Sequence, residues 1–195
     1  MAPPGKWLTG LCDCFAEGCC GVCCAVCWCS HITTGQLYQR TTSAGLVNAV
    51  KGANCLSITV ALFILTGINI MLWSVAEASY ETKEYGYKTR SATMETLAGV
   101  AQIFGFFSSL ITCLVVCTVR KAIRKRDGIA AANCGEDCED CCCASFCNPC
   151  TQCQIFRQEE IDCAKYQICS KTATAVDVEG SKYKPGAAAT VTSSA

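Results

Sequence analysis

Two long stretches without a charged side chain dominate the pattern of hydrophobic and polar positions. They cover residues 55–75 and 97–119. A helix needs about 20 mostly apolar residues to cross the hydrocarbon core of a bilayer, and each stretch reaches that length. Two buried helices of a soluble core are the alternative, but such helices usually carry a polar stripe. The pattern therefore predicts a transmembrane hairpin, with Trp73 near one end as an interfacial anchor.

These two stretches divide the chain into six segments. We expect an all-α membrane protein with a two-helix transmembrane hairpin and a cysteine-rich cytosolic module formed by both flanking segments. The tail is rich in Ala, Thr, Ser and Gly, which is typical of disorder. The expected segments are an N-terminal cysteine-rich segment (1–54), transmembrane helix 1 (55–75), a non-cytosolic loop (76–96), transmembrane helix 2 (97–119), a C-terminal cysteine-rich segment (120–170) and a disordered tail (171–195).

Basic residues indicate the side of the membrane on which each segment lies. Residues 120–126 contain five Lys or Arg side chains, and Arg40 and Lys51 precede the first stretch. Because an excess of Lys and Arg marks the cytoplasmic side, we expect both termini in the cytosol. The expected location is the plasma membrane, as a multi-pass protein. The basic run has a second interpretation, which is contact with anionic headgroups at about 1 kcal/mol per residue.

Cysteine is the most unusual feature of the composition, with 21 of 195 residues. Such a content indicates a disulfide scaffold in short secreted chains, but the opening MAPPGKW lacks the pattern of a cleaved signal peptide. If both flanking segments lie in the cytosol, their thiols stay reduced, whereas a disulfide scaffold would require the opposite topology. Metal ligation and S-acylation remain. The zero net charge and few aromatic residues argue against a nucleic-acid partner.

Several cysteines form C-x-x-C pairs, such as Cys138 with Cys141. Two intervening residues let a tight turn direct both sulfurs at one tetrahedral ion such as Zn²⁺, and thiolates also suit Cd²⁺ or Cu(I). The single histidine, His31, either completes a Cys/His set with nearby Cys29 or is an ordinary packing residue. The three consecutive cysteines at 141–143 suit palmitoylation at least as well as chelation. The acidic residues among them are interpreted as a solvated helix start or as an attractor of cations.

Three motifs carry a family resemblance. Residues 7–15 read WLTGLCDCF, residues 23–36 read CCAVCWCSHITTGQ, and residues 146–157 read FCNPCTQCQIFR. In order, they resemble W-S-T-G-L-C-D-C-F, C-C-x-x-x-x-C-P-C followed by I-T-F-G-Q, and F-C-x-P-C-x-x-C-Q-x-x-R. These are motifs of the placenta-specific gene 8 family, which includes plant cadmium-resistance proteins and cell-number regulators. Ser30 stands here for the proline, and His31 for the final cysteine.

The resemblance implies membrane localisation, oligomerisation and a link to the handling of divalent heavy metals or calcium. Histidine in place of cysteine keeps a soft-metal ligand, which favours coordination over a disulfide at that position. The expected ion is Zn or another soft divalent metal. The expected partners are the lipid bilayer, divalent cations and a second copy of the chain or another membrane-complex subunit. The candidate metal ligands are Cys23, Cys24, Cys29, His31, Cys138, Cys141, Cys147 and Cys150.

The two predicted spans contain no acidic, basic or imidazole side chain, which are the usual marks of an intramembrane ion path. Their polar residues are spaced so that they share one face of each helix. Such a face serves either helix packing, helped by Gly67 and Gly105, or a pore, which would need an oligomer because two helices cannot enclose a channel. The candidate residues of this face are Thr66, Asn69, Gln102 and Ser109.

Three functions are compatible with this pattern. The first is an oligomeric membrane protein for transport or homeostasis of heavy-metal or divalent cations such as Zn, Cd or Ca. The alternative is a non-conducting structural or regulatory subunit whose cysteine-rich module is acylated or binds a partner. The third is a protein that perturbs lipid. We expect no enzymatic activity, because the sequence offers no phosphate loop and no nucleophile with a plausible partner histidine.

Overall fold

A computed structural model of the chain describes residues 5–11, 13, 21–48, 50–78, 81–82, 88–89, 92–131, 135–161 and 166–174. In this part of the chain the fold is helical, apart from one pair of two-residue strands, and the predicted all-α class is confirmed. The elements are α1 (Gly21–Trp28), α2 (Ser30–Ser43), α3 (Cys55–Ala78), β1 (Glu81–Thr82), β2 (Lys88–Thr89), α4 (Ala92–Asp127), α5 (Glu136–Phe146) and α6 (Asn148–Gln158).

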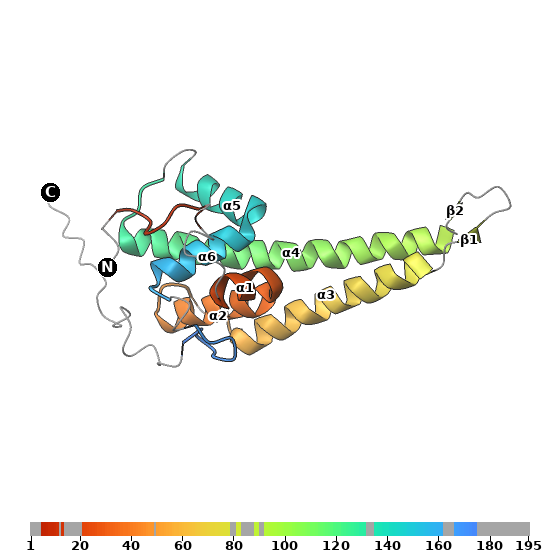
Figure 1. The fold of residues 1–195 in the computed structure, drawn as a ribbon, viewed down its shortest axis with the longest axis horizontal. Helices are drawn as coiled ribbons and strands as arrows, with labels where there is room; N and C mark the ends of the chain where they lie inside the picture. Colours follow the sequence, from red (N-terminus) through yellow and green to blue (C-terminus); the bar gives the residue numbers. More distant parts are fainter. Residues whose placement is uncertain are drawn as a thin grey trace.

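Helices α3 and α4 are the two longest elements. They pack against each other toward the β1–β2 end and diverge toward their other ends (Figure 1). Both are long and apolar enough to cross a membrane, with mean hydropathies of 2.2 and 2.1 over their best 18-residue windows. Only 11% and 22% of these windows are buried, whereas a core helix of a soluble protein would be covered by its neighbours. The expected spans lie within α3 and α4, and both helices extend into the expected loop. Residues 79–80, 83–87 and 90–91 of that loop lie outside the described residues.

Helices α1, α2, α5 and α6 gather around the basic end of α4 (Figure 1). We call this body the module. Its core is a cluster of buried apolar side chains that includes Val26 of α1, Leu37 of α2, Ile123 of α4 and Phe156 of α6. Segments from before α3 and after α4 therefore share one hydrophobic core.

A buried ion-pair cluster fixes α5 and the N-terminal segment on α4. Asp140 is fully buried and accepts hydrogen bonds from Arg120 Nε at 2.9 Å and from Arg124 Nη2 at 2.7 Å. Arg124 also pairs with Glu139 at 2.7 Å, and the ring of Trp7 lies 4.2 Å from the Arg120 guanidinium. Two residues of the basic run are therefore committed to internal pairs rather than to lipid headgroups.

A second ion-pair cluster ties α2 to the ends of α4 and α6. Glu159 lies 3.2 Å from Arg40 Nε and 2.7 Å from Arg126 Nη1. Next to it, Gln158 Nε2 donates to Asp127 at 2.7 Å. Because each pair joins residues far apart in the sequence, the two clusters determine how the flanking segments meet.

The start of the expected disordered tail lies against α2. Gln36 Nε2 donates to the carbonyl of Ser170 at 2.7 Å, and Arg40 donates to the carbonyl of Thr172 at 3.3 Å. The remaining tail residues, 175–195, lie outside the described part of the chain, as do Cys12, Cys14, Cys19, Cys20, Cys134 and Cys163.

Candidate functional site

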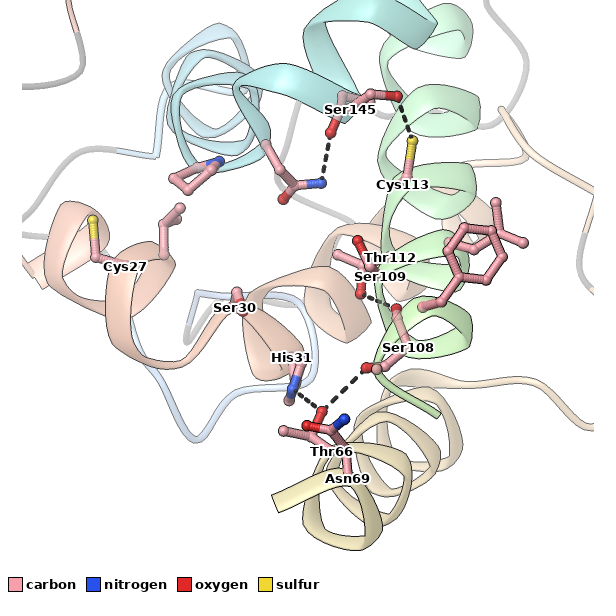
Figure 2. A pocket seen from close by; sticks show the side chains of 17 residues that line it. Cys27, Ser30, His31, Thr66, Asn69, Ser108, Ser109, Thr112, Cys113 and Ser145 are labelled. Carbon is pink, nitrogen blue, oxygen red and sulfur yellow. Dashed lines mark hydrogen bonds between the residues drawn. The ribbon is translucent and has the colours of Figure 1, made fainter. Parts of the chain in front are cut away.

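The candidate site is a cavity of about 550 Å³, lined by polar and apolar side chains, where the module meets α3 and α4 (Figure 2). The end of α1 and the start of α2 form one wall, and α3 and α4 form the floor. The last turn of α5 and the start of α6 form the opposite wall. The polar and thiol residues that line it are Cys27, Ser30, His31, Thr66, Asn69, Ser108, Ser109, Thr112, Cys113, Ser145 and Asn148.

A chain of hydrogen bonds connects the module to both long helices inside this cavity. His31 Nε2 lies 2.9 Å from Thr66 Oγ1 of α3, which in turn lies 3.1 Å from Ser108 Oγ of α4 (Figure 2). The side chain of Phe63 packs edge-on against the imidazole, with ring centroids 5.3 Å apart. The geometry therefore joins three helices through one imidazole and two hydroxyl groups.

The imidazole of His31 is in the neutral state, in which histidine binds metal ions. Burial lowers its pKa below the usual 6.5, so the ring is neutral near pH 7. Its Nδ1 is buried and has no hydrogen-bond partner among the described residues. In the tautomer in which Nε2 donates its hydrogen to Thr66, Nδ1 carries the free lone pair and can accept a proton or a metal ion.

Sulfur and amide groups line the side of the cavity formed by α5 and α6. Cys113 Sγ lies 3.1 Å from Ser145 Oγ, and Asn148 Nδ2 donates to the carbonyl of Ala144 at 3.1 Å. Cys27 lies on the opposite wall (Figure 2). The cavity therefore offers thiol and imidazole groups, which zinc-like ions accept as ligands, together with hydroxyl and amide groups, which bind water.

The predicted packing or pore face is divided between the cavity and the outer surface. Thr66, Asn69 and Ser109 line the cavity, whereas Gln102 is exposed on α4. The hydroxyl that meets Thr66 belongs to Ser108, one position before the predicted Ser109. The spacing of polar residues along one helix predicts which of them share a face, but it does not give the rotation of that helix against its neighbour.

The eight predicted metal ligands differ in their exposure within the module. Cys23 is buried, Cys24, Cys138 and Cys141 are exposed, and Cys29, Cys147 and Cys150 are half-buried. Within the described residues, no three His, Cys, Asp or Glu side chains converge so as to hold one ion. Of the eight, the lining of the cavity includes His31.

Several cavity residues are not among the sequence candidates: Cys27, Ser108, Thr112, Cys113, Ser145 and Asn148. Cys113 is detectable as a thiol within an apolar run, and Ser108 as the neighbour of Ser109. Ser145 and Asn148 carry no signal, because they reach the cavity only after α5 folds back along α4. The thiol of Cys141, a predicted ligand, lies instead 3.0 Å from Cys117 Sγ.

Fold and site together define a cysteine-rich protein with two apolar helices of membrane-spanning length and a helical module at one end. The chain belongs to the PLAC8 family, whose profile matches residues 7–158. The predicted family resemblance is thereby confirmed. No solved structure matches the chain significantly.

The chain is also similar to curated plant proteins. Cell number regulator 7 of Zea mays is 26% identical over 153 residues, covering 78% of this chain and 57% of the relative. Cell number regulator 4 of Zea mays is 26% identical over 160 residues, covering 80% and 67%. Protein PLANT CADMIUM RESISTANCE 2 of Arabidopsis thaliana is 38% identical over 63 residues, covering 27% and 40%. The family and these relatives are consistent with a metal-related or regulatory role.

Proposed function

We propose that this chain is an oligomeric membrane protein for transport or homeostasis of heavy-metal or divalent cations such as Zn, Cd or Ca. The observation that carries the proposal is the cavity where the module meets the two apolar helices, which is lined by His31, whose Nδ1 has no hydrogen-bond partner among the described residues. The similarity to a protein named for cadmium resistance supports the same class of substrate. We propose neither a catalytic reaction nor a nucleic-acid partner.

The proposed arrangement in the membrane is a hairpin of α3 and α4, with the module and both termini in the cytosol of a plasma-membrane protein. The exposed apolar surface of both helices supports it, and so do Lys121 and Lys125 at the module end of α4. In the reducing cytosol the cysteine thiols would be available as soft ligands.

The proposed substrate site is the cavity, where His31 supplies nitrogen and Cys27 and Cys113 supply sulfur. Conduction across the membrane requires more than one copy, because two helices enclose no channel. The exposed faces of α3 and α4 provide surface for such contacts.

A complementation assay tests the proposal. Metal-sensitive cells expressing the chain should tolerate more Cd²⁺ or Zn²⁺ than cells with an empty vector, and H31A should lose about tenfold or more of that effect, as loss of a soft ligand implies. S43A is the matched control, because Ser43 is an exposed polar residue on the same helix as His31 and lies outside the cavity. Equal tolerance of H31A and the parent chain, at equal protein level, would refute the role of the cavity.

The second candidate function is a non-conducting regulatory subunit with an acylated module. Exposed thiols of Cys24, Cys138, Cys141 and Cys142 favour it, as does similarity to proteins named cell number regulators. Hydroxylamine-sensitive acyl exchange on the purified protein, without any change in metal tolerance, would support this function over the first.

A further inference from the structure

Helix α5 has its charged and apolar faces reversed relative to a helix on a water-soluble surface. Asp140 and Glu139 turn inward to the arginines of α4, and Asp140 is fully buried. The first turn keeps one exposed charge, Asp137. Beyond it, the outward face carries Cys138, Cys142 and, in the last turn, Phe146. Phe146 is 89% exposed, the highest value among the exposed large hydrophobic side chains of the described residues.

Three contacts along α5 show how far it reaches down α4. Asp137 pairs with Lys121 at 2.5 Å. One turn later Cys141 lies 3.0 Å from Cys117, and one further turn later Ser145 lies 3.1 Å from Cys113. α5 therefore runs antiparallel to α4, from the basic end of that helix into its uncharged stretch. At 1.5 Å per residue, Cys113 lies about 10 Å beyond Arg120 along α4.

Helix α1 lies on the other side of the cavity, at the same position along α4 as the end of α5. Its sequence, GVCCAVCW, contains no charged side chain, and its last residue, Trp28, is 87% exposed. Its Val26 and Cys27 line the cavity together with Thr112 and Cys113 of α4. The ends of α1 and α5 thus lie beside the uncharged part of α4, whose neighbouring side chain Leu114 is also exposed.

We propose that α1 and α5 are embedded in one leaflet of the bilayer, with Trp28 and Phe146 in contact with phospholipid acyl chains. The inference rests on the proposed membrane span of α3 and α4 and adds that the module is partly immersed. Its supporting features are the absence of charge on α1 and on the outer face of the last turns of α5, the depth given by the three contacts, and continuity with the exposed apolar surface of α4. An aromatic side chain at the depth of Cys113 on α4 has the apolar surroundings that Trp and Phe favour in membranes.

Tryptophan quenching in vesicles tests this inference on the full chain. The protein is reconstituted in phosphatidylcholine vesicles with or without lipids brominated on the acyl chains, and three single-tryptophan versions are compared. W7F/W73F retains Trp28, W7F/W28F retains Trp73 on α3, and W28F/W73F retains Trp7 in the ion-pair cluster. We expect brominated lipid to reduce emission of Trp28 and Trp73 by about twofold or more, and aqueous iodide to leave both nearly unchanged.

Trp7 serves as the matched control, since it packs on Arg120 within the module and should not respond to brominated lipid. F146W in a chain with all three native tryptophans changed to Phe reports on α5 independently. If W7F disturbs the fold, the difference in emission between the parent chain and W28F gives the Trp28 signal with Trp7 in place. Circular dichroism checks that each variant keeps its helices.

The outcomes separate this inference from the proposed function. Quenching of Trp73 by brominated lipid together with quenching of Trp28 by iodide alone would overturn the immersion of the module and leave the hairpin intact. Response of neither tryptophan to brominated lipid would overturn both. Response of Trp28 without Trp73 would retain the immersion of α1 and overturn the span of α3.

Discussion

Asp140 shows most clearly, at the scale of single residues, what the sequence does and does not reveal. From the sequence, the acidic residues before Cys141 suit a solvated helix start or a cation attractor, because the helix dipole favours carboxylates there. The structure instead buries Asp140 between Arg120 and Arg124. No periodic pattern indicates which carboxylate of an acidic run turns inward, so this partner could not be predicted.

Neutralising Asp140 should therefore destabilise the module strongly. D140N leaves two buried guanidinium groups without their shared carboxylate, and removing one partner of a buried pair costs about 3–5 kcal/mol. Denaturant or thermal unfolding in mild detergent measures this loss. D137N is the control, since Asp137 forms an exposed pair with Lys121 and its removal should change stability little. Similar losses in the two variants would contradict the buried cluster.

The arginine on the other side of this pair should keep its charge at high pH. Although burial opposes the charged form, hydrogen bonds to Asp140 and Glu139 hold the pKa of Arg124 above its usual value. The guanidinium of Arg124 therefore stays charged at the highest pH at which the protein can be handled.

His31 gives a prediction about pH. Its folded pKa lies below the usual 6.5, so the unfolded chain binds the proton more readily. The free energy of unfolding should therefore decrease as the pH falls from about 7 through 6.5 and below, and this component should be absent in H31Q. As the chain contains one histidine, histidine-selective NMR can follow its titration directly. A midpoint at or above 6.5 would contradict the burial of the ring.

At the scale of elements, close contacts between helices occur at some glycines and not at others, and the sequence alone does not show which. A Cβ at Gly35 of α2 would clash with Thr59 and lie 2.7 Å from the carbonyl of Cys55 on α3. A Cβ at Gly105 would lie 2.8 Å from Asn69 Nδ2. Gly67, which the sequence also suggests for close approach, has nothing within 4 Å of that position among the described residues.

G35A and G67A form a matched pair of tests for these contacts. G35A should lose about 1–3 kcal/mol of stability, because backbone of α3 must move to admit the methyl group. G67A should be neutral or gain about 0.5–1 kcal/mol, because Ala is the better helix former and the site is open. Thermal unfolding in detergent compares the two, and equal effects would argue against the α2–α3 contact.

The sequence predicted the helices that are encoded by long uncharged apolar stretches, and it did not predict the short helices. The two uncharged stretches indicated α3 and α4, because a run of about 20 apolar residues without charge is typical of a membrane-spanning helix. Helices α1 and α5 gave no clear helical period, since cysteine occupies both their buried and exposed faces. The cavity itself was not predictable, because its walls come from elements more than 100 residues apart, such as His31 and Asn148.

The whole molecule yields a prediction about sidedness. If both ends and the module are cytosolic, epitope tags at the two termini should bind antibody only after the plasma membrane is permeabilised. A tag inserted between β1 and β2, at the opposite end of α3 and α4, should bind antibody on intact cells. The reverse pattern would place the cysteine-rich module in an oxidising compartment, where disulfides would replace free thiolate ligands.

Helix α4 has 36 residues and is therefore about 54 Å long, well beyond the thickness of a hydrocarbon core. The middle of this helix forms part of the cavity through Ser108, Thr112 and Cys113. Farther along the same helix, Arg120 and Arg124 form the ion pairs that hold the module. A rotation of α4 about its axis would turn the cavity wall, and the arginines that pair with the module, in the same direction. A rotation of α4 at its β1–β2 end would thus be transmitted along one uninterrupted helix to the cysteine-rich module.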